Sequence, residues 1–235
     1  MLKVAVLFYA VEFAAALILP RLLGGTAAQQ GVWRFIMMFP NVGFIGYPVV
    51  VALFGQEALF YAVILVMPFN LLAFTLGPLM LTGARRFSLK QMFTPAVIAS
   101  VIALVLALAR IRLPALVGEC LDFVGDVTVP LSLLVVGSLL AGLPARQVMA
   151  SLRLWLLAAV RLLGLPVLIW LILKNMNIST LILRIAVIQM AMPGAVNGSL
   201  LCLEHGGDSE TMAQAVFLTT LLSIVTIPLV TAILL

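Results

Sequence analysis

Apolar residues fall into eight long runs along the chain, separated by short polar connections. These runs cover approximately residues 3–22, 31–54, 57–82, 93–110, 117–142, 149–173, 179–204 and 210–234. A helix needs about 20 consecutive apolar residues to span a bilayer. Strands of a membrane β-barrel would instead alternate apolar and polar residues over about ten positions, whereas these runs are apolar on every side. The pattern predicts an all-α, polytopic membrane protein with eight transmembrane helices.

Two of the runs contain sequences that break helices. Residues 40–48 read Pro-Asn-Val-Gly-Phe-Ile-Gly-Tyr-Pro, and residues 193–198 read Pro-Gly-Ala-Val-Asn-Gly. Proline removes a backbone donor, so the freed amides and carbonyls at membrane depth must face protein or a water-filled cavity. Paired interruptions of this kind are typical of transporters that bind their substrate between two broken helices.

The two interruptions belong to a weak internal repeat. An offset of about 150 positions relates Pro40 to Pro193, and it also relates Glu12 to Arg161. The two interrupted runs are five helices apart, and an odd separation means that they cross the membrane in opposite directions. The repeat is therefore predicted to be an inverted one with two crossing broken helices.

The same repeat leaves residues 93–142 without a counterpart. If the first three runs correspond to the last three, two helices are missing before Met1. We therefore expect this chain to be an N-terminally truncated version of a ten-helix fold.

Composition and charge agree with a membrane protein. Apolar residues make up 65% of the chain and charged residues 9%, against roughly a quarter charged in soluble proteins. The net charge of +5 could indicate nucleic acid, but the basic residues cluster on one predicted side: Arg21, Arg85, Arg86, Lys90 and Arg146. The positive-inside rule makes that side cytoplasmic, which places both termini outside the plasma (inner) membrane. Nucleic acid is not an expected partner.

The interruptions supply the candidate substrate site. A half-helix that begins in the membrane presents free amides that attract an anion, whereas the carbonyl ends suit a cation. The candidate substrate-binding residues are Pro40, Asn41, Gly43, Gly46, Asn70, Gln189, Pro193, Asn197 and Ser223. The alternative is that proline and glycine only kink packed helices and that the hydroxyl residues only allow close packing.

Three ionisable residues are candidates for ion coupling. Glu12 and Arg161 each lie in the middle of a run, and charges at that depth are functional hypotheses by default. They could pair as a static salt bridge, or Glu12 could carry a proton while Arg161 attracts a carboxylate. Asp126 is the deepest acid of residues 117–142, although a solvated helix end explains it equally well. A metal site is not expected, because His205 is the only histidine.

Several motifs together resemble the auxin efflux carrier family. They are residues 40–48, 130–137, 192–197, 206–208 and 219–228. The resemblance implies two inverted five-helix repeats whose fourth and ninth helices are broken and cross, as in bile-acid symporters and sodium/proton antiporters. On this mapping residues 1–82 and 148–235 form the two halves of a moving transport domain. Residues 93–142 then form part of a scaffold through which a homodimer would assemble.

The expected function is secondary active transport. Neither a Walker-type phosphate loop nor a dinucleotide fingerprint occurs, so neither a nucleotide cofactor nor an enzyme activity is expected. The resemblance implies a small organic anion, such as a carboxylate or an indole-type weak acid, moved by alternating access. Coupling to H+ or Na+ is left open. The alternatives are a sodium/bile-acid-type symporter and, because two helices are missing, a non-transporting membrane subunit or relic.

Overall fold

The computed structural model describes residues 2–83, 95–109, 111–127, 130, 131, 134, 138 and 151–235. These residues form helices and turns and contain no β-strand, so the all-helical prediction is confirmed for this part of the chain. The helices before residue 84 are α1 (Leu2–Leu23), α2 (Ala27–Met38), the π-helical turn η1 (Val42–Gly46), α3 (Tyr47–Phe54) and α4 (Ala58–Thr82). They are followed by α6 (Pro95–Leu108) and α7 (Ala115–Asp126). The last part contains α10 (Leu152–Ala159), the π-helical turn η2 (Val160–Gly164), α11 (Leu165–Leu173), α12 (Thr180–Met190), α13 (Asn197–His205) and α14 (Ser209–Leu234).

Three of the described helices are long and apolar enough to cross a membrane. They cover Lys3–Leu23, Leu152–Leu173 and Ser209–Leu234. A fourth is added if Ala58–Phe69 and Leu71–Thr82, which meet at 42°, count as one bent span. These helices coincide with four of the predicted runs. The described residues therefore support a polytopic membrane protein.

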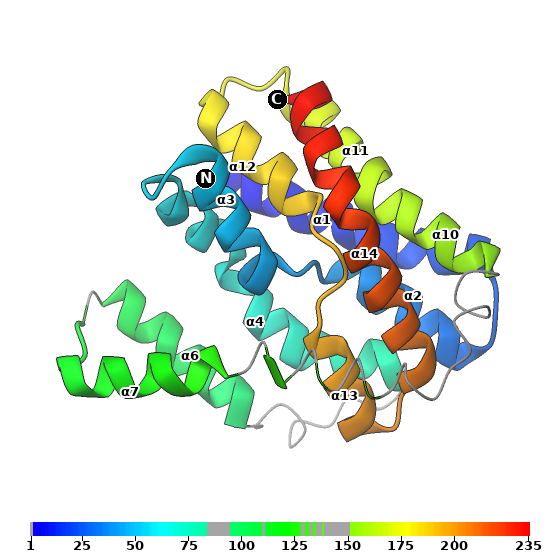
Figure 1. Ribbon diagram of the computed structural model, residues 1–235, viewed down its shortest axis with the longest axis horizontal. Helices are drawn as coiled ribbons and strands as arrows, with labels where there is room; N and C mark the ends of the chain where they lie inside the picture. Colours follow the sequence, from blue (N-terminus) through cyan, green and yellow to red (C-terminus); the bar gives the residue numbers. More distant parts are fainter. Residues whose placement is uncertain are drawn as a thin grey trace.

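Eight spanning helices are not confirmed. The run predicted at 93–110 contains α6, which has 14 residues, and the run at 117–142 overlaps α7 (Ala115–Asp126), which has 12 residues. At about 1.5 Å per residue both are shorter than the hydrocarbon core of about 30 Å. No residue of α7 is buried, and Figure 1 shows α7 at the edge of the molecule beyond α6, which packs against α4.

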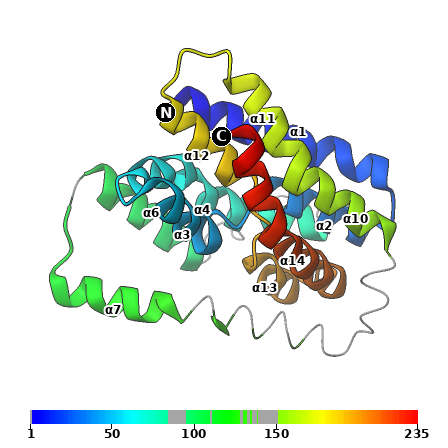
Figure 2. The ribbon, with the colours of Figure 1, turned by 45° about the horizontal axis from the view of Figure 1, so that its top comes forward.

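Most of the remaining helices share a large hydrophobic core although they come from opposite ends of the chain, and α3 packs with parts of α4 and α12 in a second, smaller cluster. Helix α1 packs against α2 and α11, α2 against α4, α10 against α14, and α11 against α12. Phe8, Trp33, Phe35, Leu157 and Met212 are all buried in this core. Figure 2 shows α1, α11 and α12 close together. This packing brings the two predicted interruptions into the same region.

Both predicted interruptions are confirmed, and local backbone preferences explain them. Phe39 is extended at φ −125° and ψ 90°, as expected for a residue whose proline neighbour disfavours the helical region. Helix α2 therefore ends at Met38, and the helix restarts only at Val42. In the other run α12 ends at Met190 and α13 begins at Asn197, with Pro193 between them.

Candidate functional site at the crossing of two broken helices

The two interruptions contact each other through their backbones. Pro40 and Gly194 form an antiparallel bridge. The amide of Asn41 donates a hydrogen bond to the carbonyl of Pro193 at 2.7 Å, and the amide of Ala195 donates one to the carbonyl of Phe39 at 3.0 Å. In Figure 1 the extended segment between α12 and α13 passes the one that follows α2. Backbone groups released by each break therefore pair with those of the other.

The two segments approach closely at Gly194. A Cβ atom added at Gly194 would overlap Cδ1 of Ile36, which belongs to the other broken helix. The amide of Gly194 donates to Oγ1 of Thr219 at 3.2 Å, so α14 also holds this segment. Proline at position 193 interrupts the helix, and glycine at position 194 allows the two interrupted segments of the chain to approach each other.

Each interrupted helix contributes two ends of opposite polarity. Helices α2 and α12 end at the crossing, where their last carbonyls lack intrahelical donors, whereas η1 and α13 begin there with their amide ends. The carbonyl ends carry a partial negative charge and the amide ends a partial positive charge. One side of the crossing therefore suits a cation and the other an anion.

Arg161 lies on the carbonyl side and pairs with Glu12. Its Nη2 atom is 3.3 Å from Oε1 of Glu12, and neither side chain is exposed. The guanidinium also donates to the carbonyls of Met37, Met190 and Met192 at 2.9 to 3.1 Å. Glu12 and Arg161 were predicted either to form a salt bridge or to act separately, and the structure shows the salt bridge.

A cavity of about 660 Å³ lies on the amide side. Asn41, Gly43 and Asn197 line it where η1 and α13 begin. Its walls are largely apolar and include Phe44, Val66, Phe69, Phe74, Leu200 and Leu201. Glu204 also lines it and is 67% exposed, which places this carboxylate towards the mouth. None of the described residues that line the cavity is Lys, Arg or His.

Several buried polar atoms near the crossing have no hydrogen-bond partner among the described residues. They include Nδ2 of Asn41, Oδ1 of Asn197, Oγ of Ser199 and both polar atoms of the Gln189 amide. Buried polar groups are nearly always paired, so each exception needs an explanation such as a ligand or a bound water. Asn41 and Asn197 also line the cavity, so a ligand bound there would lie next to these two side chains.

A comparison with protein families identifies the class of protein. The family model described as "Membrane transport protein" matches residues 78–231, which include α12, α13 and most of α14. The chain belongs to the membrane transport protein family. This family includes the auxin efflux carriers, so the resemblance drawn from the sequence is confirmed.

Two relatives of this family member are named only as transporters. An uncharacterised transporter of Methanothermobacter thermautotrophicus is 27% identical over 193 residues, which are 80% of this chain and 63% of the relative. An uncharacterised transporter of Methanocaldococcus jannaschii is 26% identical over 203 residues, which are 83% of this chain and 65% of the relative. The chain thus spans slightly less than two thirds of the length of each.

The structure brings together most of the residues predicted to bind substrate in this membrane transport protein. Pro40 and Pro193 form the crossing, and Asn41, Gly43 and Asn197 line the cavity. Gly46 and Gln189 are in contact, since a Cβ atom at Gly46 would overlap Oε1 of Gln189. Glycine at this position lets the amide side chain of α12 lie directly against the backbone of the other broken helix.

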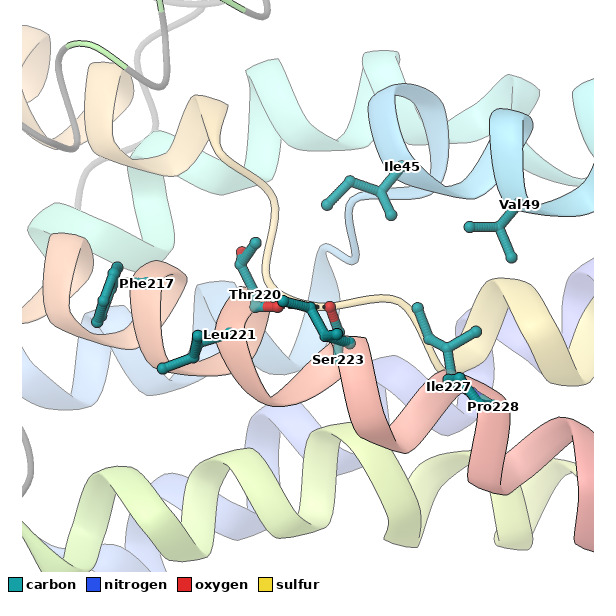
Figure 3. Close-up of a pocket in the computed structure, with 9 residues that line it drawn as sticks. Ile45, Val49, Phe217, Thr220, Leu221, Ser223, Ile227 and Pro228 are labelled. Atoms are coloured by element: carbon teal, nitrogen blue, oxygen red, sulfur yellow. Dashed lines mark hydrogen bonds between the residues drawn. The ribbon is translucent and has the colours of Figure 1, made fainter.

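Ser223 lies elsewhere. It lines a mostly apolar groove of about 480 Å³ between α14 and the segment η1–α3, where Ile45 and Val49 face α14 (Figure 3). Its hydroxyl donates to the carbonyl of Thr220 at 2.6 Å, which satisfies it within its own helix. The structure does not place Ser223 with Asn41 and Asn197.

Two other predicted residues are not brought to the crossing. Asp126 is the last residue of α7 and is exposed. Asn70 lies at the bend of α4, between its two straight segments, and its side chain is outside the part of the structure that is described.

The sequence analysis did not assign the aromatic walls or Glu204 to the site. Phe44 lies inside the motif of residues 40–48, but its orientation cannot be read from the motif. Glu204 follows Asn197 by seven positions, with Leu200 and Leu201 between them, and this spacing places all four on one face of a helix. Applying helical periodicity from Asn197 would therefore have found Glu204.

Substituting Glu12 should destabilise the protein strongly. In Glu12→Ala the buried guanidinium of Arg161 loses its counter-charge, and breaking a buried ion pair costs about 3–5 kcal/mol. We expect a correspondingly large drop in the free energy of unfolding, measured by denaturant or thermal unfolding of the purified protein in detergent. Glu57 is exposed and makes no side-chain cap, so Glu57→Ala should stay within about 0.5 kcal/mol of wild type. Equal effects of the two substitutions would contradict the assigned role of the pair.

Proposed function

We propose that this chain is a secondary active transporter of small organic anions that holds its substrate in the cavity at the crossing. The observation that carries the proposal is the position of Asn41 and Asn197. Each stands where a broken helix restarts, both line one cavity, and Nδ2 of Asn41 is a hydrogen-bond donor without a partner among the described residues. Two helix N-termini and an amide donor together form a site that favours negative charge.

The lining indicates the chemistry of the substrate. Positive potential comes from helix ends and amides, without a cationic side chain among the described lining residues, and this suits one carboxylate better than several. Phe44, Phe69 and Phe74 offer apolar and aromatic surface to the remainder of the molecule. Glu204 would repel a second negative charge near the mouth. The substrate class is therefore a monoanion with an apolar or aromatic body, including indole-type weak acids.

Transport would proceed by alternating access. In this proposal residues 1–82 and 148–235 move as the transport domain, and residues 93–142 belong to a scaffold that also mediates a homodimer. Glu12 is the proposed carrier if a proton is coupled. We also propose that both termini lie outside the plasma membrane. The chain spans 63% and 65% of the length of its two relatives, so we also propose that this chain is active on its own. If the purified chain binds no anion, the alternative function as a non-transporting subunit is favoured.

Replacing either asparagine should weaken anion binding. A hydrogen bond to a charged group is worth about 1.5–3 kcal/mol, so Asn41→Ala and Asn197→Ala should each raise the dissociation constant of a monocarboxylate by about 10- to 100-fold. Benzoate and indole-3-acetate serve as probes. Binding is measured as the dose-dependent rise in unfolding temperature of the purified protein.

Ser223→Ala is the matched control, because this residue lies in a different groove. It should bind both probes like wild type. Wild-type affinity in both asparagine variants would refute the site. Absence of binding by the wild-type protein to any monocarboxylate would instead favour the non-transporting alternative.

Removing the charge of Glu204 should change selectivity between anions. In Glu204→Gln the second carboxylate of a dicarboxylate such as succinate no longer meets a negative charge at the mouth. Because the repulsion between two partly solvated charges is about 1 kcal/mol, the affinity for succinate should improve by about threefold to tenfold. The affinity for benzoate should change less. Glu210 is on the same turn but bonds to Gln214 and does not line the cavity, so Glu210→Gln should leave the selectivity unchanged. Parallel changes in both Glu variants would show that Glu204 does not act on the site.

A further inference from the structure

The carbonyl side of the crossing needs positive charge. Helices α2 and α12 both end there, and each end carries about half a negative charge from its last carbonyls. In transporters built on broken helices such ends, together with unwound carbonyls, coordinate the coupling cation. In this protein the same carbonyls already have a partner.

That partner is the guanidinium of Arg161, and every one of its donors is used. Nε donates to the carbonyl of Met192 at 3.1 Å, Nη1 to that of Met37 at 2.9 Å, and Nη2 to that of Met190 at 3.1 Å. Nη1 and Nη2 also donate to Oε1 of Glu12 at 3.3 Å. A guanidinium has five N–H donors in a planar fork, and these five bonds account for all of them.

The bonds connect both broken helices and two other elements. Met37 belongs to α2, Met190 is the last residue of α12, and Met192 is in the unwound segment. Arg161 itself is in η2, a π-helical turn within the otherwise α-helical segment Leu152–Leu173. Such turns insert an extra residue into a helix and occur frequently at functional sites. A single side chain thus holds the C-terminal ends of α2 and α12 in place relative to each other.

We propose that Arg161 is the protein's own resident cation at the crossing and that the anion site is assembled without a sodium ion. A sodium ion would have to compete with a covalently attached, fully hydrogen-bonded guanidinium for the carbonyl oxygens of Met37, Met190 and Met192. Arg161 acts as a positioning residue, because it fixes the ends of α2 and α12 while the cavity lies where η1 and α13 begin. The statement about coupling rests on the proposed transport function, but the positioning role does not.

The first test uses the wild-type protein without any anionic ligand. Its unfolding temperature is measured in NaCl, KCl and choline chloride at equal ionic strength, with NaCl titrated into choline chloride. The proposal predicts the same unfolding temperature in all three salts. A saturable, sodium-specific rise would overturn it, because it would reveal a sodium site that stabilises the fold.

The second test replaces the resident cation. Arg161→Ala should lower the unfolding temperature, and millimolar guanidinium chloride should restore part of the loss while leaving wild type unchanged. Arg161→Lys keeps the charge but has three donors without the planar fork, so it should lie between Arg161→Ala and wild type. Arg184 is half-buried on α12 and makes none of these bonds, so Arg184→Ala is the control that guanidinium should not rescue.

The outcomes separate this inference from the proposed function. Arg161→Ala that folds but gains nothing from guanidinium, or that is as stable as wild type, would overturn the positioning role. If Arg161→Ala does not fold in any condition, the proposal is tested by Arg161→Lys and by the sodium titration instead. An unfolding temperature of Arg161→Lys equal to that of wild type would overturn the role of the planar fork. Failure of wild type to bind benzoate would count against the transport function alone, because none of these measurements uses the anion.

Discussion

Backbone groups released inside a hydrophobic chain must find partners within the protein, and the structure at residues 39–41 and 191–196 depends on this constraint. An unpaired amide or carbonyl facing lipid would cost several kcal/mol. Here the two broken segments satisfy each other through the bonds of Asn41 to Pro193 and of Ala195 to Phe39. Each interruption thus supplies part of the hydrogen bonding that the other needs.

The crossing divides its surroundings into two chemically different sides. On the carbonyl side a complete set of guanidinium bonds fills the need for positive charge, with Glu12 as counter-ion. On the amide side two helix starts face a cavity that Asn41 and Asn197 line. Because Arg161 already occupies the carbonyl ends while the two helix starts face a cavity, the arrangement favours binding of an anion in that cavity rather than a cation.

Short-range chemistry made the interruptions predictable, because proline and its preceding residue act on the local backbone. The offset of about 150 positions also indicated that Glu12 and Arg161 correspond, and they pair. The carbonyls that Arg161 reaches could not be predicted, since they depend on where α2 and α12 end in space. For the same reason Ser223 was grouped with the site, although the rotation of α14 turns it into another groove. The runs at 93–110 and 117–142 were apolar enough for spans, but hydropathy does not fix where a helix ends.

The most direct test of the crossing as an anion site is an experimental structure of the full chain, solved by electron cryomicroscopy with an antibody fragment and saturating benzoate. This account predicts interrupted helices at residues 39–41 and 191–196, with the carboxylate of benzoate between Asn41 and Asn197. Continuous helices through either segment, or a well-occupied carboxylate at another place with this cavity empty, would contradict it.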